Sequence, residues 1–135
     1  RITIAIMADQ GMLEQIAAQC SKLIPVISVK ILDESVSIRR EVALIKVDAA
    51  DHAKRNEIIQ LANVFRAKVI DVAKTSLTLE VFGSKSKISA LIEMLADFGI
   101  LEIAKTGTIA IERGRSTIYD DNKLKEEYNY GKNVL

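Results

Sequence analysis

The chain has 135 residues, enough for one compact domain or two small ones. Lys+Arg 19 against Asp+Glu 18 leaves a net charge of +1, which argues against nucleic acid as a dominant partner. A single cysteine excludes an internal disulfide, and the absence of an apolar run of about 18 residues predicts no membrane span.

The first 33 residues predict a strand–helix–strand unit. Residues 2–6 alternate Ile, Thr, Ile, Ala, Ile as a half-buried strand does, and residues 26–32 alternate in the same way. Between them, Asp9 is the expected cap of a helix that Pro25 closes. The expected apolar stripe of this helix is Leu13, Ile16, Ala17, Cys20 and Leu23. We interpret residues 1–33 as the second half of a βαββαβ domain, whose first half would precede Arg1.

Residues 34–40 are mostly polar and show no clean period. This composition predicts a linker between two domains.

Residues 41–114 predict a complete β-α-β-β-α-β unit. The expected elements are a strand at 41–48, a helix from Asp51 to Arg66, strands at 68–73 and 77–83, a helix that follows Ser84 and ends at Gly99, and strands at 100–104 and 108–112. Short links at 74–76 and 105–107 suit hairpins. The predicted fold class is therefore α+β, with two helices on one face of an antiparallel ferredoxin-like sheet.

The strand at 41–48 is apolar on both faces, because Val42 and Leu44 point one way while Ala43, Ile45 and Val47 point the other. The two helices cover one face, so the other needs a cover from a second copy or a sister domain, and we expect a homodimer. The residues expected at a partner or domain interface are Arg39, Arg40, Glu41, Ala43, Ile45, Val47, Lys105 and Thr106.

No catalytic or metal site is predicted. His52 beside Asp51 is interpreted as an exposed first-turn helix residue, and Cys20 as a small core residue. The βαββαβ order also occurs in RNA-recognition modules, but the two central strands offer only Phe82 for base stacking. An acylphosphatase-like enzyme is disfavoured because the loop Asp48-Ala49-Ala50-Asp51 would repel phosphate.

Residues 115–135 form a charged tail that contains Tyr119, Tyr128 and Tyr130. We favour a solvated end for this tail over a docking arm.

Five stretches in register carry a family resemblance. They are Leu13–Ile16 continuing through Lys22–Ile24, Arg40–Val47, Phe65–Val72, Ser76–Val81 with Gly83, and Phe98–Ile100 running through Glu102 and Ala104 to Thr106-Gly107 and Ile109-Ala110. On these residues the chain, from about Arg1 to Gly114, resembles the regulatory small subunits of acetohydroxyacid synthase, also called acetolactate synthase. The resemblance departs at Lys105, where the family usually has Arg, a change that matters if that side chain makes a bidentate contact.

The resemblance implies an ACT domain, of which residues 1–33 would be the C-terminal half, followed by a ferredoxin-like domain. It implies a non-catalytic regulatory subunit that activates a catalytic large subunit and mediates valine feedback in branched-chain amino-acid biosynthesis. The catalytic partner would use thiamine diphosphate, FAD and magnesium, and this chain would hold no cofactor. The effector site is expected upstream of Arg1, and the expected location is the cytoplasm, or the plastid stroma in a photosynthetic eukaryote.

Two other functions stay open at this stage. A free-standing ACT-type sensor would bind an amino acid and act on another enzyme or on a transcription factor. An enzyme would show turnover by this chain alone, for which the sequence offers no convergent nucleophile and base.

Overall fold

The computed structural model describes residues 1–120, which divide into two compact units. Unit 1 consists of Arg1–Thr3 and Arg39–Ile109. Unit 2 consists of Ile4–Ile38 and the described residues from Ala110 onward. Unit 1 is thus almost a single continuous stretch of chain, whereas unit 2 is assembled from the two segments that flank it.

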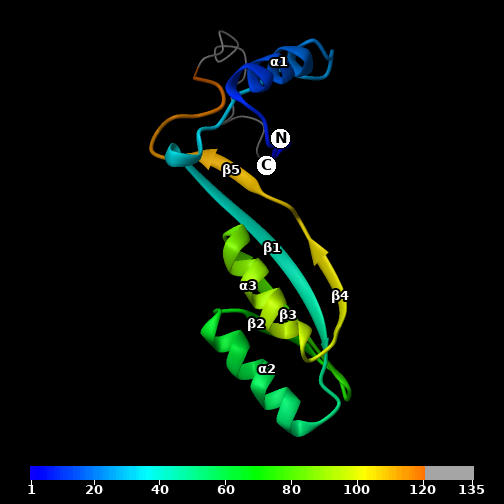
Figure 1. The fold of residues 1–135 in the computed structure, drawn as a ribbon. Coiled ribbons are helices and arrows are strands. Elements are labelled where there is room, and N and C mark those ends of the chain that lie inside the picture. The colour runs from blue at the N-terminus through cyan, green and yellow to red at the C-terminus, as the bar shows by residue number, and fades with distance from the viewer. Residues whose placement is uncertain (121–135) are drawn as a thin grey trace, which may run out of the picture. The chain divides into compact units, whose positions relative to one another are not determined.

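Most of the strands lie in unit 1 and follow the predicted β-α-β-β-α-β order (Figure 1). The elements are β1 (Ser37–Asp48), α2 (His52–Val64), β2 (Lys68–Val72), β3 (Ser76–Gly83), α3 (Lys85–Ala96), β4 (Ile100–Lys105) and β5 (Ile109–Glu112). The sheet has the strand order β2-β3-β1-β4, and β5 also pairs with β1. All of the registered pairs are antiparallel, which confirms the predicted ferredoxin-like fold class.

Local side-chain signals set the helix ends in unit 1. The Asp51 carboxylate accepts a hydrogen bond from the backbone N–H of Lys54 at 2.8 Å, and the Ser84 hydroxyl accepts one from Lys87 at 3.3 Å. Beyond α3, Gly99 takes a φ of 93°, a left-handed conformation in which glycine avoids steric strain. All three positions act as the sequence predicts.

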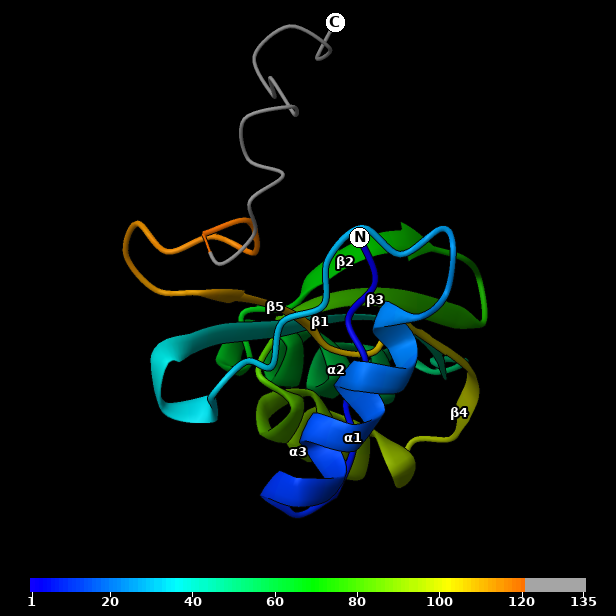
Figure 2. The same cartoon turned by 90° about the horizontal axis from the view of Figure 1, so that it is seen from above.

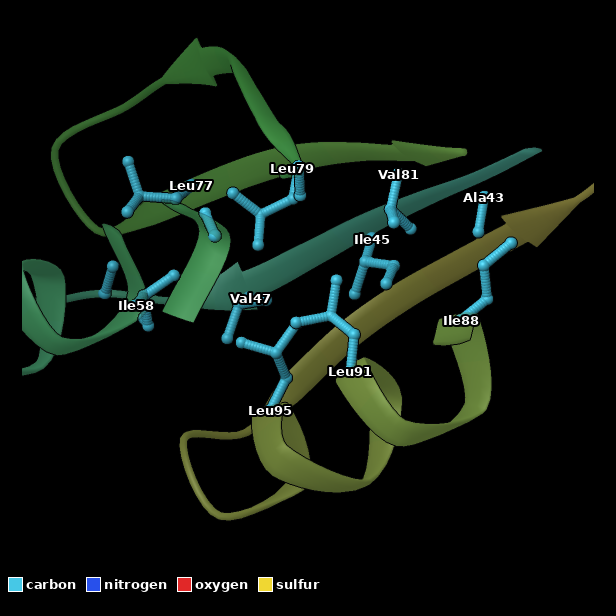
Figure 3. Packing of buried hydrophobic residues seen from close by; sticks show 13 residues of the cluster. Ala43, Ile45, Val47, Ile58, Leu77, Leu79, Val81, Ile88, Leu91 and Leu95 are labelled. Atoms are coloured by element: carbon cyan, nitrogen blue, oxygen red, sulfur yellow. The ribbon is translucent and has the colours of Figure 1, made fainter. Parts of the chain in front are cut away.

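Helices α2 and α3 cover one face of the sheet, and the aliphatic core lies between the two layers (Figures 2 and 3). The largest fully buried side chains are Ile45, Ile58, Leu77, Leu79, Ile88, Leu91, Leu95, Val47 and Val81. They come from β1, β3 and both helices, so every long element of unit 1 contributes to one cluster.

The predicted hairpin between the last two strands is wrong, whereas the β2–β3 hairpin is confirmed. Strand β5 pairs with β1 rather than with β4, so β4 and β5 follow one another along the same 12-residue strand. The sequence signal at Gly107 is real, since its φ is 73°, but it marks an interruption in a strand. The pairing partner is distant in sequence, which local turn chemistry cannot reveal.

Unit 2 contains one α-helix, α1 (Gln10–Ser21), within its described residues. The Asp9 carboxylate caps it by accepting from the Met12 N–H at 2.8 Å, as predicted. The strands predicted at 2–6 and 26–32 are wrong, because neither stretch is a strand in the structure. A strand needs a neighbour to complete its hydrogen bonds, and no described strand pairs with either stretch.

The stretch predicted as a linker, residues 34–40, contains regular secondary structure. Residues Glu34–Val36 form a 3-10 turn, and β1 already begins at Ser37. Pairing with β5 explains the early start, and the Val36 carbonyl accepts from the Arg113 N–H at 2.8 Å just beyond the strand. The division into domains itself stays a prediction.

The first part of the tail makes hydrogen bonds to its own unit, although residues 115–117 and 120 are exposed, and the role of the tail stays a prediction. The Lys30 ammonium donates to the Thr117 carbonyl at 3.2 Å and to the Glu112 carboxylate at 2.6 Å, and the Ser28 hydroxyl donates to the Ile118 carbonyl at 3.2 Å. Tyr128 and Tyr130 lie outside the described residues.

Candidate interaction site

The predicted Arg39-Arg40-Glu41 cluster divides into two environments. Both arginines are exposed, and the Arg40 guanidinium donates to the Arg39 carbonyl at 2.7 Å. Glu41 is only 5% exposed, and one carboxylate oxygen accepts a hydrogen bond from the Thr108 hydroxyl at 2.8 Å. Its other oxygen has no hydrogen-bond partner among the described residues. The arginines can therefore meet a partner directly, whereas Glu41 is buried.

Thr106 has a structural role at the break between β4 and β5. Its hydroxyl accepts from the Val42 N–H at 3.1 Å, and its own N–H donates to the Val42 carbonyl at 3.0 Å. The side chain thus supplies a bond that strand backbone would otherwise make. Lys105, opposite Ala43 in the register, is exposed.

The structure places Ala43, Ile45 and Val47 in the core, so the predicted interface takes the wrong face of β1. None of the three is more than 1% exposed. They face α2 and α3 with the other core residues (Figure 3). Both faces of this strand are apolar, and the sequence alone did not say which one the helices cover.

The opposite face of the sheet carries no helix of unit 1, and we call it the open face. It consists of the side chains that alternate with the core residues along the three longest paired strands: Val42, Leu44, Lys46, Thr78, Glu80, Phe82, Glu102 and Ala104. Leu44 is 41% exposed and Phe82 is 59% exposed. Sequence reasoning named none of these as interface residues, although the alternation in β1 and β3 marks them as one set.

An ion pair crosses the charged end of the open face. The Lys46 ammonium lies 2.9 Å from the Glu102 carboxylate. The hydrogen bond from Lys46 lowers the pKa of Glu102, and the same bond raises the pKa of Lys46, with a smaller contribution from the negative charge of Asp71. Both groups therefore stay charged across the neutral pH range and compensate each other.

The remaining candidate groups show no convergence in the structure. His52 is the first residue of α2 and is exposed, as predicted. Cys20 is a half-buried free thiol on α1. Within residues 1–120 no group of three or more His, Cys, Asp or Glu side chains could hold a metal ion. In the same range, no helix has the length and apolar character that a bilayer span requires.

Comparison with known proteins gives a consistent result. Residues 40–114 match the family model described as the small subunit of acetolactate synthase. Over 118 residues, the chain is 44% identical to the probable acetolactate synthase small subunit of Methanothermobacter thermautotrophicus, covering 87% of this chain and 70% of that protein. Over 114 residues it is 46% identical to the acetolactate synthase small subunit of Mycobacterium bovis, covering 84% of this chain and 67% of that protein.

A solved structure extends the comparison to the fold. The crystal structure of the acetolactate synthase small subunit from Thermotoga maritima matches with a TM-score of 0.74 at 37% identity. The match covers 82% of this chain and 68% of that chain.

Proposed function

Because the chain belongs to the family of acetolactate synthase small subunits, we propose that it activates the catalytic subunit of that enzyme and transmits feedback by valine. The observation that carries the proposal is the family match over residues 40–114 together with the identities of 44% and 46%. A regulatory role as a partner of the catalytic subunit follows from that family. Activation, valine response and a homodimeric state are the finer parts of the proposal.

The surface chemistry of unit 1 supports a role in protein binding. The hydroxyls of Thr106 and Thr108 make hydrogen bonds inside this unit, to the Val42 N–H and to the Glu41 carboxylate. Arg39 and Arg40 in β1 are exposed, and so are the apolar side chains Leu44 and Phe82 of the open face. Arginine and apolar anchors are the groups that protein interfaces favour.

We propose a shift in population as the mechanism. A regulatory subunit that binds the active state of the catalytic subunit better than its resting state raises activity, and an effector that changes this preference lowers it. Coupling of this kind is typically about 1–3 kcal/mol. In this scheme thiamine diphosphate, FAD and magnesium belong to the catalytic subunit. The cytoplasm is the proposed location, because the relatives named above come from prokaryotes.

The test is acetolactate formation by the cognate catalytic subunit, with and without this chain, each with and without valine. The proposal expects stimulation by the chain and co-purification of the two proteins. A chain that binds an amino acid without affecting acetolactate formation would instead be a free-standing sensor. Turnover by the chain alone would make it an enzyme.

A charge reversal can connect the assay to the structure. Arg40→Glu should raise the concentration of chain needed for half-maximal stimulation, because Arg40 is exposed at the start of β1. Lys85→Glu is the matched control, since Lys85 is exposed at the first turn of α3 and carries the same charge. Equal effects of the two reversals would remove Arg40 from the binding surface.

A further inference from the structure

The two edges of the sheet in unit 1 differ in regularity. Strand β2 pairs only with β3 and forms one edge, and β4 pairs only with β1 and forms part of the other (Figure 1). The register of β2 shifts in its middle, between Val69 and Asp71, and a bulge of this kind hinders the addition of a further strand. In β4 the shift lies near the first residue and leaves residues 102–105 regular. The edge formed by β4 is therefore the better suited to take another strand.

Strand β4 is exposed although most of it is apolar. Its sequence is Ile-Leu-Glu-Ile-Ala-Lys, and every residue after Ile100 is exposed. Ile103 lies directly opposite the fully buried Ile45, yet it is 39% exposed, because a strand covers only one of its flanks. Leu101 is 58% exposed. A strand on the uncovered flank would remove apolar area of Ile103 from water.

The backbone of β4 has hydrogen-bonding groups on the same uncovered flank. The Thr106 N–H donates to the Val42 carbonyl at 3.0 Å, so Thr106 directs its amide toward β1. Along an antiparallel strand, successive residues direct their N–H and C=O groups alternately toward one neighbour and away from it. By this alternation Ala104 bonds to β1, whereas Ile103 and Lys105 direct their backbone groups away from it. No strand within residues 1–120 pairs with β4 on that side.

The side chain of Lys105 restricts what the added strand can be. Its ammonium is exposed and makes no hydrogen bond or ion pair with any residue from 1 to 120. Lys105 lies two residues from Ile103, so both side chains are on the same face of the sheet. A matching strand places a carboxylate opposite Lys105 and an apolar side chain opposite Ile103. Such a strand has an acidic residue two positions away from an apolar one.

A second copy of β4 does not meet this requirement. Antiparallel pairing of two copies centred on Ile103 would set Lys105 opposite Leu101. Pairing centred on Lys105 would set the two lysines opposite each other. In both arrangements the ammonium has no carboxylate opposite it. The chemistry of this edge therefore favours a segment of a different protein.

We propose that an extended segment of the catalytic subunit adds to the sheet as a strand beside β4, with an acidic residue opposite Lys105 and an apolar residue opposite Ile103. Main-chain hydrogen bonds supply affinity in this mode of recognition, and the two side-chain positions supply specificity. The inference rests on the proposed function, which makes the catalytic subunit a partner, and adds the mode of binding and the chemistry of the bound segment.

The test is hydrogen exchange of the full chain, read residue by residue, alone and in complex with the catalytic subunit. In the chain alone, the Ile103 and Lys105 amides should exchange about tenfold faster or more than the Ala104 amide, which bonds to β1. In the complex, both should slow by about tenfold or more. The amides of β2, at the other edge of the sheet, are the internal control and should not change.

Two substitutions separate the main-chain contribution from the charge, with affinity for the catalytic subunit measured by calorimetric titration. Ile103→Pro removes the outward N–H and no bond to β1, so circular dichroism should show an intact fold while affinity falls by about tenfold or more. Lys105→Glu should weaken binding by a similar factor, because a carboxylate then faces a carboxylate. Lys74→Glu is the matched control and should leave affinity unchanged. Lys74 is exposed between β2 and β3 and carries the same charge.

Three outcomes would overturn the inference and leave the proposed function in place. The catalytic subunit binds and is stimulated while the Ile103 and Lys105 amides exchange as in the chain alone, or Lys105→Glu and Lys74→Glu weaken binding equally. In the third outcome the two amides become protected in the chain alone as its concentration rises, which would assign this edge to a second copy. If no complex forms with the catalytic subunit, the proposed function fails and the inference fails with it.

Discussion

Helices α1 and α3 have the same length of 12 residues and the same kind of N-terminal cap, yet they differ completely in burial. Helix α3 lies on the sheet of unit 1 and buries Ile88, Leu91 and Leu95. Helix α1 in unit 2 buries none of its residues among those described, although its sequence carries a similar apolar stripe. The comparison teaches that an apolar stripe predicts a helix, whereas burial requires a second layer to receive it.

The sharpest test of this comparison is truncation of one leucine on each helix. Leu91→Ala should lower the free energy of unfolding by about 2–5 kcal/mol, because it leaves a cavity in the core of unit 1. Leu13→Ala should cost about 1 kcal/mol or less, since Leu13 is only half-buried. Urea unfolding followed by circular dichroism measures both, and equal losses would contradict the difference between the helices.

A smaller loss of stability is expected when the hydrogen bonds of Arg55 in unit 1 are removed. The Arg55 guanidinium donates to the carbonyls of Ala49, Ala73 and Lys74 at 3.1, 2.7 and 2.9 Å. All three bonds come from one nitrogen, Nη2, so Arg55→Ala removes them together, and we expect a loss of about 1.5–3 kcal/mol in unfolding free energy. Lys54→Ala is the control. It breaks an exposed ion pair, in which the Lys54 ammonium lies 3.7 Å from the Asp48 carboxylate, and should cost at most about 1 kcal/mol in unfolding free energy.

A smaller effect is expected at Thr106, which lies between β4 and β5 where both strands pair with β1. Thr106→Val removes the acceptor for the Val42 N–H and should cost about 0.5–1.5 kcal/mol. Hydrogen exchange at the Val42 amide should accelerate in the valine variant, while Thr106→Ser should keep the protection. If the amide exchanges equally in all three proteins, the side chain does not hold the strand.

The smallest effect concerns pH and the exposed Lys46–Glu102 pair. Because the pKa of Glu102 is lowered, the stability it contributes is present above its usual value of 4.5 and is lost as the pH falls through the lowered pKa. Because the pKa of Lys46 is raised, its contribution is present below 10.5 and is lost as the pH rises through the raised pKa. NMR titration of Glu102→Gln should find the Lys46 pKa closer to 10.5, and an unchanged pKa would remove Glu102 as the cause.

The predictable part of the fold rests on signals within a few residues of each other. Asp9, Asp51, Ser84 and Gly99 fix the helix ends through contacts three or four residues away, and all act as expected. The pairing of β5 with β1 joins segments about 70 residues apart, so no turn signal at Gly107 could reveal it. The strands predicted at 2–6 and 26–32 failed for a related reason, because alternation describes a face and cannot supply a neighbour.

The candidate site shows a different limit of sequence reasoning. Strand β1 was predicted to be apolar on both faces, and the structure confirms this prediction. The choice between Ala43, Ile45 and Val47 on one face and Val42 and Leu44 on the other depends on which face receives α2 and α3. That choice is made by the handedness of the connections in three dimensions, which periodicity does not encode.

The ion pair between Lys30 and Glu112 has a consequence for the order of folding. The two residues are 82 positions apart, and closing a flexible loop of that length costs about 4 kcal/mol of chain entropy beyond a constant. Nearly all of unit 1 lies within this loop, and the Thr108–Glu41 hydrogen bond already brings its two ends together. A chain emerging from the ribosome also completes residues 39–109 first. Unit 2 should therefore form last, on a loop that unit 1 has already shortened.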